Sequence, residues 1–282
     1  MTVAARRRVV FRAVPLDRSL EALPLFRLSD SADDGAISYT DGAGGRWRVI
    51  PSPDDRLPGT FDQDVYIELL RRYHEAGEPA DGAISFTLHA FLRAMGRRVD
   101  GRTYEQLRSA LSRLERTALE SNGMYESAAG TRSDLRFSLL TSVAVERRRS
   151  LDREQLQLFS GIATGEPGVA RVVLSPMIRD NLAANRTINI STQCYWALGS
   201  PVARRLYRLL EVARADGKLA WRVALDQLAE QLPLAQRYPS HLQRVLQPAH
   251  DMLVAQGVLR NAAIRQHQRE WFVDYILGSR PA

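Results

Sequence analysis

The feature that most constrains the fold is a spacing of apolar residues that occurs in both halves of the chain. The distance between matched positions drifts slowly, from 140 residues at the start of the pattern to 135 at its end. A slow drift with small gaps at loops is typical of a duplicated fold. We therefore predict two copies of one small fold in tandem. The matched positions are Leu69, Leu70 and Gly77 with Leu209, Leu210 and Gly217; Leu88 and Phe91 with Leu225 and Leu228; Leu107 and Leu111 with Leu242 and Leu246; and Phe137 with Phe272.

In the first copy, apolar periodicity predicts three helices followed by a hairpin. A helix begins at Thr60 and ends near Gly77, and residues 84–119 read as two amphipathic helices joined by a short basic turn. Residues 124–149 then read as strand, turn and strand. Three helices and a hairpin are the order of a winged helix, whose hairpin can lie along the DNA backbone beside the groove.

The second copy repeats this order. Ser200 is expected to cap a helix that runs to Gly217, a second helix covers residues 221–232, and a third covers residues 240–256. Residues 258–277 supply two strands. The predicted fold class is α+β and mainly helical, with two tandem winged-helix domains related by internal duplication.

Composition shifts give the expected domain boundaries. Residues 1–25 are expected to form a basic N-terminal arm and residues 26–150 the first winged-helix domain, with a small hairpin at 36–50. Residues 151–170 are mixed and end in a Gly-rich stretch, so they are expected to be a linker. The second winged-helix domain then covers residues 171–282.

The basic residues are unevenly distributed. The chain has 39 Lys and Arg against 32 Asp and Glu, and Lys218 is its only lysine. Residues 1–96 have a net charge of −2, residues 97–150 of +4, and residues 151–282 of +5. The positive charge therefore begins with the third predicted helix of the first copy, as a nucleic-acid-binding face would require.

Candidate DNA-binding residues lie on the outward faces of the third helix of each copy and on the hairpins. Arg and Gln are the side chains that read guanine and adenine bidentately, while hydroxyls and imidazoles can reach phosphates or base edges. An ordinary solvated charged face is the alternative for each helix. The candidates are Arg102, Ser109, Arg113, Arg116 and Arg132 in the first copy, and Arg237, Ser240, His241, Gln243, Arg244, Gln247, Arg265 and Arg269 in the second.

Several other classes of protein find no support in the sequence. Cys194 is the only cysteine, the five histidines include no His-x-His pair, and no GxxxxGK[ST] motif occurs. We therefore expect no cofactor, no metal site and no nicking or ATP-hydrolysing activity. The chain has no long apolar run and no secretory signal pattern, so a cytoplasmic protein associated with the nucleoid or a plasmid is expected.

Specific motifs also resemble a known family. The stretch ISFTLHAFLRAMGRRVDGRTYEQLRSALSRLERT is similar to the most characteristic segment of the plasmid replication initiators of the replication initiator protein A type. SPVARRLYRLLE and RVLQPAHDML resemble helices of iteron-binding initiators. The matched residues of the first segment are Gly101, Arg102, Tyr104, Glu105, Leu107, Arg108, Ala110, Leu111, Arg113, Leu114 and Thr117.

The resemblance implies a protein that binds repeated double-stranded DNA sites in a plasmid origin. It further implies that the protein helps to open the duplex and recruits host helicase and primase machinery, with a homodimer as one of its states. A winged-helix transcriptional repressor without initiator activity remains the alternative, because initiators of this type also repress their own promoters.

Overall fold

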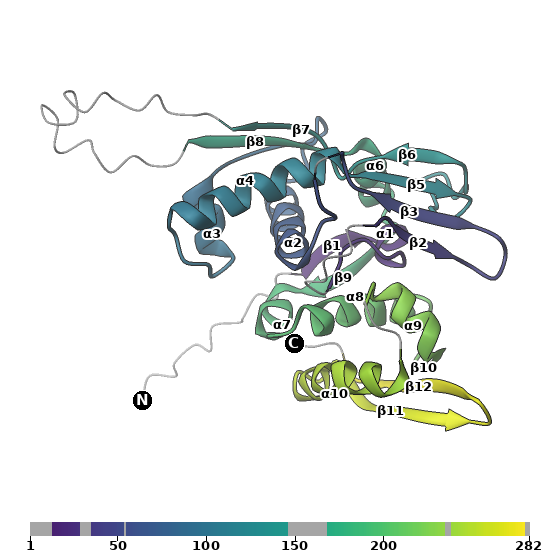
Figure 1. Ribbon diagram of the computed structural model, residues 1–282. Coiled ribbons are helices and arrows are strands. Elements are labelled where there is room, and N and C mark those ends of the chain that lie inside the picture. Colours follow the sequence, from purple (N-terminus) through teal and green to yellow (C-terminus); the bar gives the residue numbers. More distant parts are fainter. Residues whose placement is uncertain (1–12, 29–34, 54, 146–167, 235–237, 280–282) are drawn as a thin grey trace, which may run out of the picture.

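The computed structural model describes residues 13–28, 35–53, 55–145, 168–234 and 238–279. Of these residues, 41% are helical and 29% are in strands. The fold is therefore α+β, and the expectation of a mainly helical chain is wrong. Figure 1 shows two stacked bodies: a larger one around α2, α3 and α4, and a smaller one around α8, α9 and α10.

The larger body, which we call unit 1, contains in chain order a helix, a strand, two helices and two strands; two further strands, which belong to another sheet, intervene between its last helix and its last two strands. Its strands β4, β8 and β7 form an antiparallel sheet in which β8 is central. The helix α4 packs on α2, α3 and β7. The elements are α2 (Thr60–Glu75), β4 (Ala83–Thr87), α3 (Leu88–Ala94), α4 (Gly101–Arg116), β7 (Leu140–Val145) and β8 (Val169–Leu174).

The smaller body, unit 2, has the same order of elements, and its sheet order β10-β12-β11 places the last strand at the centre in the same way. The helix α10 packs on α8. Ser200 caps α8 as predicted, because its Oγ accepts a hydrogen bond from Ala203 N at 3.4 Å. The elements are α8 (Pro201–Ala215), β10 (Ala220–Ala224), α9 (Leu225–Gln231), α10 (Pro239–Ala255), β11 (Leu259–His267) and β12 (Glu270–Leu277).

The hairpin predicted for residues 124–149 is wrong. Between Phe137 and Leu140 the chain passes from one sheet to another, so β6 (Leu135–Phe137) pairs with β5 (Ala118–Asn122) while β7 pairs with β8. The buried side chains of Leu139 and Leu140 fix this crossing. Phe137 is consequently no counterpart of Phe272, which lies in β12.

Short strands also replace the starts of two predicted helices. Residues 84–87 belong to β4, and α3 begins only after Thr87, whose Oγ1 accepts a hydrogen bond from Ala90 N at 3.2 Å. In the same way Trp221 lies in β10, before α9 begins at Leu225. In each unit a strand therefore precedes the second helix.

The expected N-terminal arm is shorter than the sequence suggested. From Ala13 the chain is part of the core: β1 (Ala13–Asp17) pairs antiparallel with β9 (Thr187–Ser191), and α1 (Arg18–Glu21) follows. Residues 1–12 of that arm lie outside the described residues. So do residues 151–167 of the expected linker, whose last residues enter β8 in the sheet of unit 1.

The predicted hairpin at 36–50 is present as part of a larger sheet. The strands β2 (Ile37–Thr40) and β3 (Arg46–Ile50) pair antiparallel, and β5 and β6 extend them to a four-stranded sheet of order β2-β3-β5-β6. The helices α6 (Pro176–Ala183) and α7 (Thr192–Ala197) flank β9 in the chain.

Buried ion pairs join the two units. Arg208 on α8 donates hydrogen bonds to Glu21 Oε2 at 2.6 Å and to Gln63 Oε1 on α2 at 2.5 Å. Arg205 lies 3.4 Å from the same Glu21 oxygen and donates to the carbonyl of Leu23 at 2.8 Å. All of these polar side chains are buried, so their geometry specifies how α8 sits against α1 and α2.

Candidate nucleic-acid interface

The first two turns of α10 present a polar face to solvent. The helix starts with Pro239 at its first position, which suits the fixed φ of proline. The opposite stripe, made of Leu242, Leu246, Ala249 and Leu253, is buried against the rest of unit 2. Among the predicted DNA-binding residues of this helix, Ser240, Arg244 and Gln247 are exposed, and His241 and Gln243 are half-buried.

The fold uses little of the hydrogen-bonding capacity of this face. Arg244 Nη2 lies 3.1 Å from His241 Nδ1, and within the part of the chain that the structure describes no carboxylate pairs with Arg244. Gln247 Nε2 donates to Asp251 Oδ1 at 2.9 Å. The helix continues through Pro248 to Ala255, although proline leaves the carbonyl of Arg244 without its intrahelical donor.

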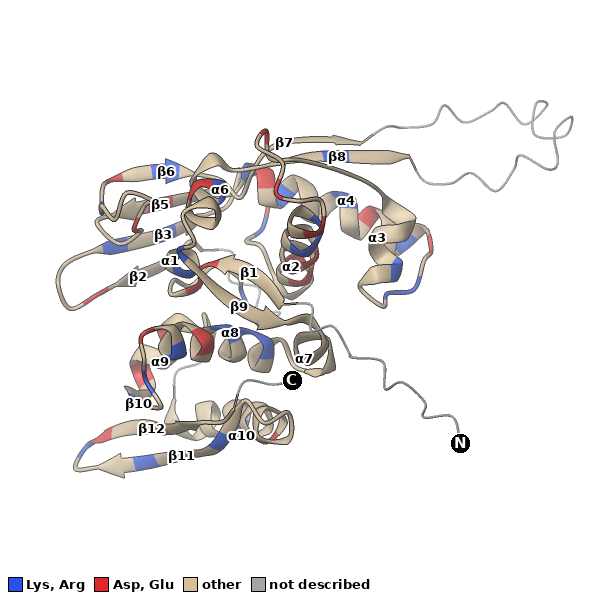
Figure 2. Cartoon of the chain, turned by 180° about the vertical axis from the view of Figure 1, so that it is seen from behind, with Lys and Arg blue, Asp and Glu red and all other residues tan. Residues whose placement is uncertain are grey.

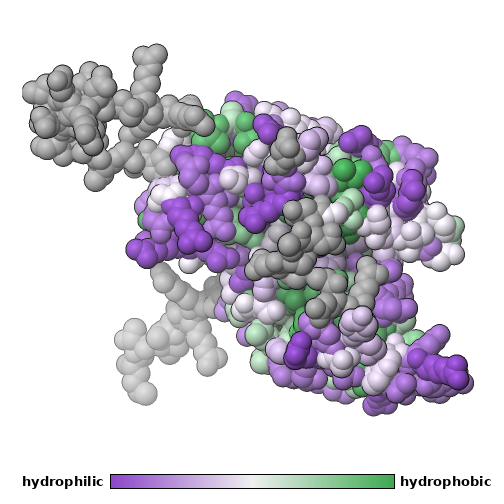
Figure 3. Space-filling model, viewed as in Figure 1, coloured by the Kyte–Doolittle hydropathy of each residue, from purple (hydrophilic) through white to green (hydrophobic). Residues whose placement is uncertain are grey.

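The hairpin β11–β12 projects from unit 2 beside this helix. Arg269 is exposed at its turn, next to Gln268, which has a positive φ of 55°. Hydrophilic side chains gather over this tip in the space-filling view (Figure 3). Arg265 is also exposed, but its Nε lies 3.9 Å from Asp274, which also pairs with Arg222.

On α4 the sequence-predicted residues separate into two groups. Arg102, Ser109 and Arg116 are exposed, as expected for a groove-facing side. Arg113 is buried: its Nη2 donates to Asp62 Oδ1 on α2 at 2.8 Å. The same Asp62 carboxylate accepts a hydrogen bond from Gly59 N at 2.7 Å and so caps α2. Arg113 therefore stabilises the fold and is not available to DNA, contrary to the prediction.

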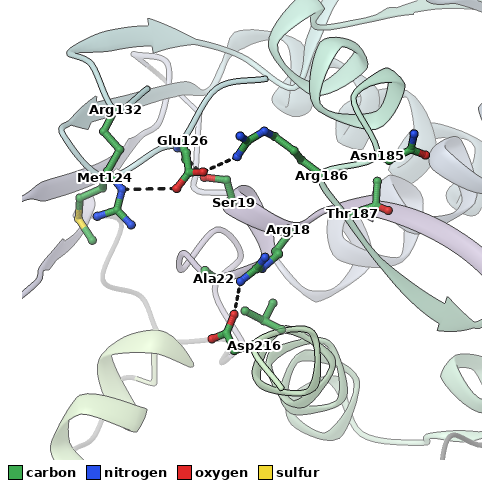
Figure 4. Close-up of a pocket in the computed structure, with 11 residues that line it drawn as sticks. Arg18, Ser19, Ala22, Met124, Glu126, Arg132, Asn185, Arg186, Thr187 and Asp216 are labelled. Atoms are coloured by element: carbon green, nitrogen blue, oxygen red, sulfur yellow. Dashed lines mark hydrogen bonds and ion pairs between the residues drawn. The ribbon is translucent and has the colours of Figure 1, made fainter. Parts of the chain in front are cut away.

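Arg132 lines a cavity of about 390 Å³ between the two units (Figure 4). Its Nε lies 3.8 Å from Glu126, which also pairs with Arg186, while Arg18 pairs with Asp216 on the opposite wall. Carboxylates thus balance much of the positive charge here. Arg132 lies in the segment between β5 and β6, away from the hairpin where the sequence placed it. Arg237 lies outside the described residues.

The two third helices begin differently. Asp100 Oδ1 accepts a hydrogen bond from Thr103 N at 2.9 Å, which closes the start of α4 and holds the pKa of Asp100 below its usual value. At the start of α10 the N-cap residue is Tyr238, whose side chain makes no cap hydrogen bond and is 75% exposed. Tyr238 was not among the predicted residues, although an aromatic residue directly before Pro239 is visible in the sequence.

Metal-binding clusters and membrane-spanning helices are both absent from the described residues. Within them, no three or more His, Cys, Asp or Glu side chains are grouped so that they could hold a metal ion. No described helix is both long and apolar enough to cross a membrane.

A family model described as replication initiator protein A matches residues 16–252, which is most of the chain. The chain belongs to the replication initiator protein A family. The match includes α4 and nearly all of α10, so the family assignment covers both exposed helix faces.

A curated relative of this chain comes from Wigglesworthia glossinidia brevipalpis and is named as a replication protein. It is 27% identical over 171 residues, which cover 59% of this chain and 55% of the relative. The aligned part thus spans about half the length of that relative.

Two solved structures have a similar fold. Domains 2 and 3 of RctB superpose with a TM-score of 0.55 at 12% identity, covering 93% of this chain and 99% of that one. A second structure of the same RctB domains gives a TM-score of 0.53 at 10% identity, covering 92% of this chain and 96% of that one. At these identities the likeness concerns the fold alone.

Proposed function

We propose that this initiator binds repeated duplex DNA sites in a replication origin, helps to open the duplex and recruits host helicase and primase machinery. The observation that carries the proposal is the exposed face of the first two turns of α10. There, among the described residues, Arg244 is paired only with an imidazole nitrogen, and it lies on the same helix turns as Gln243 and Gln247. Family membership supplies the context in which such a face reads DNA.

We further propose that units 1 and 2 are winged helices related by duplication. The shared order of elements and the shared strand neighbours support this, with β7 and β8 as the strands of the first wing. The division of the chain then falls after Leu174, at the end of β8, and no separate linker is needed at 151–170. The open start of α10 favours base reading by unit 2. Unit 1 would then serve backbone contact and a homodimeric state.

The test is a titration of the full chain against a duplex with the repeats found beside its gene, and against a scrambled duplex. Log affinity should fall linearly with log salt between ~50 and ~200 mM, because arginines displace condensed counterions. The repeats should bind more tightly at every salt concentration. Affinity that is independent of salt, or equal for both duplexes, would contradict sequence-specific groove binding.

Plasmid rescue separates an initiator from a repressor. When supplied in trans, an initiator should sustain replication of a plasmid whose origin carries the repeats. A repressor of the same fold would bind the repeats and silence a linked promoter but would not maintain the plasmid. Stable maintenance that depends on Arg244 would support the initiator function directly.

A further inference from the structure

The four-stranded sheet β2-β3-β5-β6 has one largely apolar face and one polar, arginine-rich face. Its strand register places the buried and half-buried side chains in two rows, Ile37–Val49–Leu119–Phe137 and Tyr39–Trp47–Ser121–Leu135. Because side chains alternate along a strand, the residues between them share the other face. That face, which we call the outer sheet face, consists of Ser38, Thr40, Arg46, Arg48, Glu120, Asn122 and Arg136, with the apolar pair Ile50 and Ala118 at the end next to α4.

Arginine predominates on the outer sheet face. Arg48 and Arg136 approach Glu120 from both sides, at 3.2 and 3.5 Å, so one carboxylate is shared by two guanidinium groups. Arg46 is exposed, and no ion pair of Arg46 occurs among the described residues. Three cations thus face one anion. Figure 2 shows basic positions on β3 and β6, two strands that β5 separates.

The chemistry of this face fits a phosphodiester backbone better than a protein. Protein interfaces have a core of apolar and aromatic side chains. Here the aromatic residues Tyr39, Trp47 and Phe137 all lie on the opposite face, and the outer sheet face, apart from Ile50 and Ala118 at one end, offers guanidinium, hydroxyl and amide groups beside the Glu120 carboxylate. These are the groups that contact phosphate oxygens in protein–DNA complexes. Neighbouring strands are ~4.8 Å apart, so Arg48 and Arg136 can reach different phosphates.

The chain places one end of this sheet next to the C-terminal end of α4. The helix ends at Arg116, Thr117 turns the backbone to an extended conformation, and β5 begins at Ala118. Arg116 is exposed at this junction. A helix of 16 residues is about 24 Å long, so a duplex that follows α4 over its whole length arrives at the sheet.

We propose that the outer sheet face is a second, non-helical DNA-contact surface that binds the phosphodiester backbone beyond the segment covered by α4. The inference rests on the proposed function, because it assumes that the same duplex lies along α4. The proposed contact of the outer sheet face with phosphates does not depend on the DNA sequence. This contact strengthens binding to cognate and random DNA alike.

The experiment compares the full-length chain with the triple variant Arg46→Gln/Arg48→Gln/Arg136→Gln on repeat and scrambled duplexes at several salt concentrations. Affinity for both duplexes should fall by the same factor, about tenfold or more at ~100 mM salt, with the ratio between them unchanged. The slope of log affinity against log salt should become shallower by about one for each arginine that no longer binds a phosphate. Arg222→Gln, an exposed arginine on the edge strand β10 of unit 2, is the control and should change neither quantity.

A second variant, which should strengthen DNA binding, shows whether weaker binding by the triple variant merely reflects misfolding. Glu120→Gln removes the carboxylate that Arg48 and Arg136 share, so binding to both duplexes should tighten by about two- to threefold and the salt slope should steepen. Thermal melting monitored by circular dichroism checks that each variant is folded.

The outcomes separate the inference from the function on which it rests. If the wild-type chain shows neither salt dependence nor preference for the repeats, the proposed function fails. If the wild type binds as expected while the triple variant and Glu120→Gln leave affinity and slope unchanged, the outer sheet face does not bind DNA. A weakening confined to the repeat duplex would overturn the backbone role. A change in the oligomer mass of the variants, measured by light scattering, without a change in DNA affinity would also overturn the backbone role. That result would show that the outer sheet face contacts protein.

Discussion

Asp64 on α2 and Arg204 on α8 are joined by two hydrogen bonds, of 2.8 and 2.6 Å, across the boundary between the two units. The Asp64 side chain is 1% exposed and also accepts hydrogen bonds from Arg97 Nη2 at 2.7 Å and from the hydroxyl of Tyr195 at 3.0 Å. A buried carboxylate requires such donors to offset its desolvation. One carboxylate therefore holds together the turn before α4 and the first turn of α8.

Arg204→Gln should lower the free energy of unfolding by about 3 kcal/mol, because it removes the better-buried of the two charges that compensate Asp64. Urea denaturation measures this change. Arg97→Gln is the matched variant and should cost less, since its side chain is 42% exposed and water can take the place of the guanidinium. An equal or larger destabilisation by Arg97→Gln would show that burial does not decide the strength of this pair.

Arg244→Ala should weaken binding to the cognate duplex by about 1–3 kcal/mol and relax discrimination at one base pair, if the guanidinium reads a guanine in the major groove. A phosphate contact would instead weaken cognate and scrambled duplexes together. A solvated arginine would leave both affinities as they were. Titrations of wild type and variant at two salt concentrations distinguish these three results.

Arg113→Ala should act on stability and not on recognition. The substitution leaves the Asp62 carboxylate buried without its charged partner, and about 3–5 kcal/mol of unfolding free energy should disappear. The exposed Arg116 on the same helix supplies the contrast: Arg116→Ala should leave stability unchanged and make the salt slope of DNA binding shallower by about one. If Arg113→Ala is as stable as the wild type, the structural role is wrong and Arg113 becomes a candidate DNA-binding residue again.

His250 should make stability depend on pH. Burial lowers the pKa of His250 from 6.5 to about 4, so the folded chain binds fewer protons than the unfolded chain between these values. The contribution of His250 to the free energy of unfolding should therefore fall, by up to about 3 kcal/mol, as pH drops from 6.5 towards 4, whereas Asp17, whose pKa burial raises to about 6, acts in the opposite direction.

His250→Gln is the test of this pH dependence. The variant lacks the hydrogen bond between Nε2 and the Tyr275 hydroxyl, which is 3.0 Å long, and should be less stable at pH 7. Its unfolding free energy should also vary less across that window. Equal pH dependence in both proteins would assign the effect to another group.

Local signals predicted the parts of the fold that depend on neighbours in sequence. The cap at Ser200, the hairpin at 36–50 and the helices α2 and α10 all follow from residues within a few positions of one another. The prediction of a hairpin at residues 124–149 was wrong because β7 pairs with β8, which begins only at Val169. The sequence between β7 and β8 contains no local signal that would predict pairing with so distant a strand.

The exposure of candidate residues was predictable where it follows helical periodicity, as for Arg244 and Gln247, whose contact with DNA stays a prediction. The prediction that Arg113 is exposed was wrong because this residue borders the apolar stripe of α4. At such a position an arginine side chain can point outward or inward, depending on its partner. That partner, Asp62, lies 51 positions away. The outer sheet face was missed for a related reason, since Arg48 and Arg136 become neighbours only through Glu120 on the strand between them.

The pairing of β1 with β9 affects how the chain folds as it is synthesised. Ala13–Asp17 leaves the ribosome early, but Thr187–Ser191 follows only about 170 residues later. At ordinary translation speeds the first strand therefore waits on the order of 10 to 30 s for its partner. During that interval Val14 and Leu16, both buried in the finished fold, have no sheet to join. Slower translation of the second half would lengthen the exposure of this segment to aggregation and chaperones.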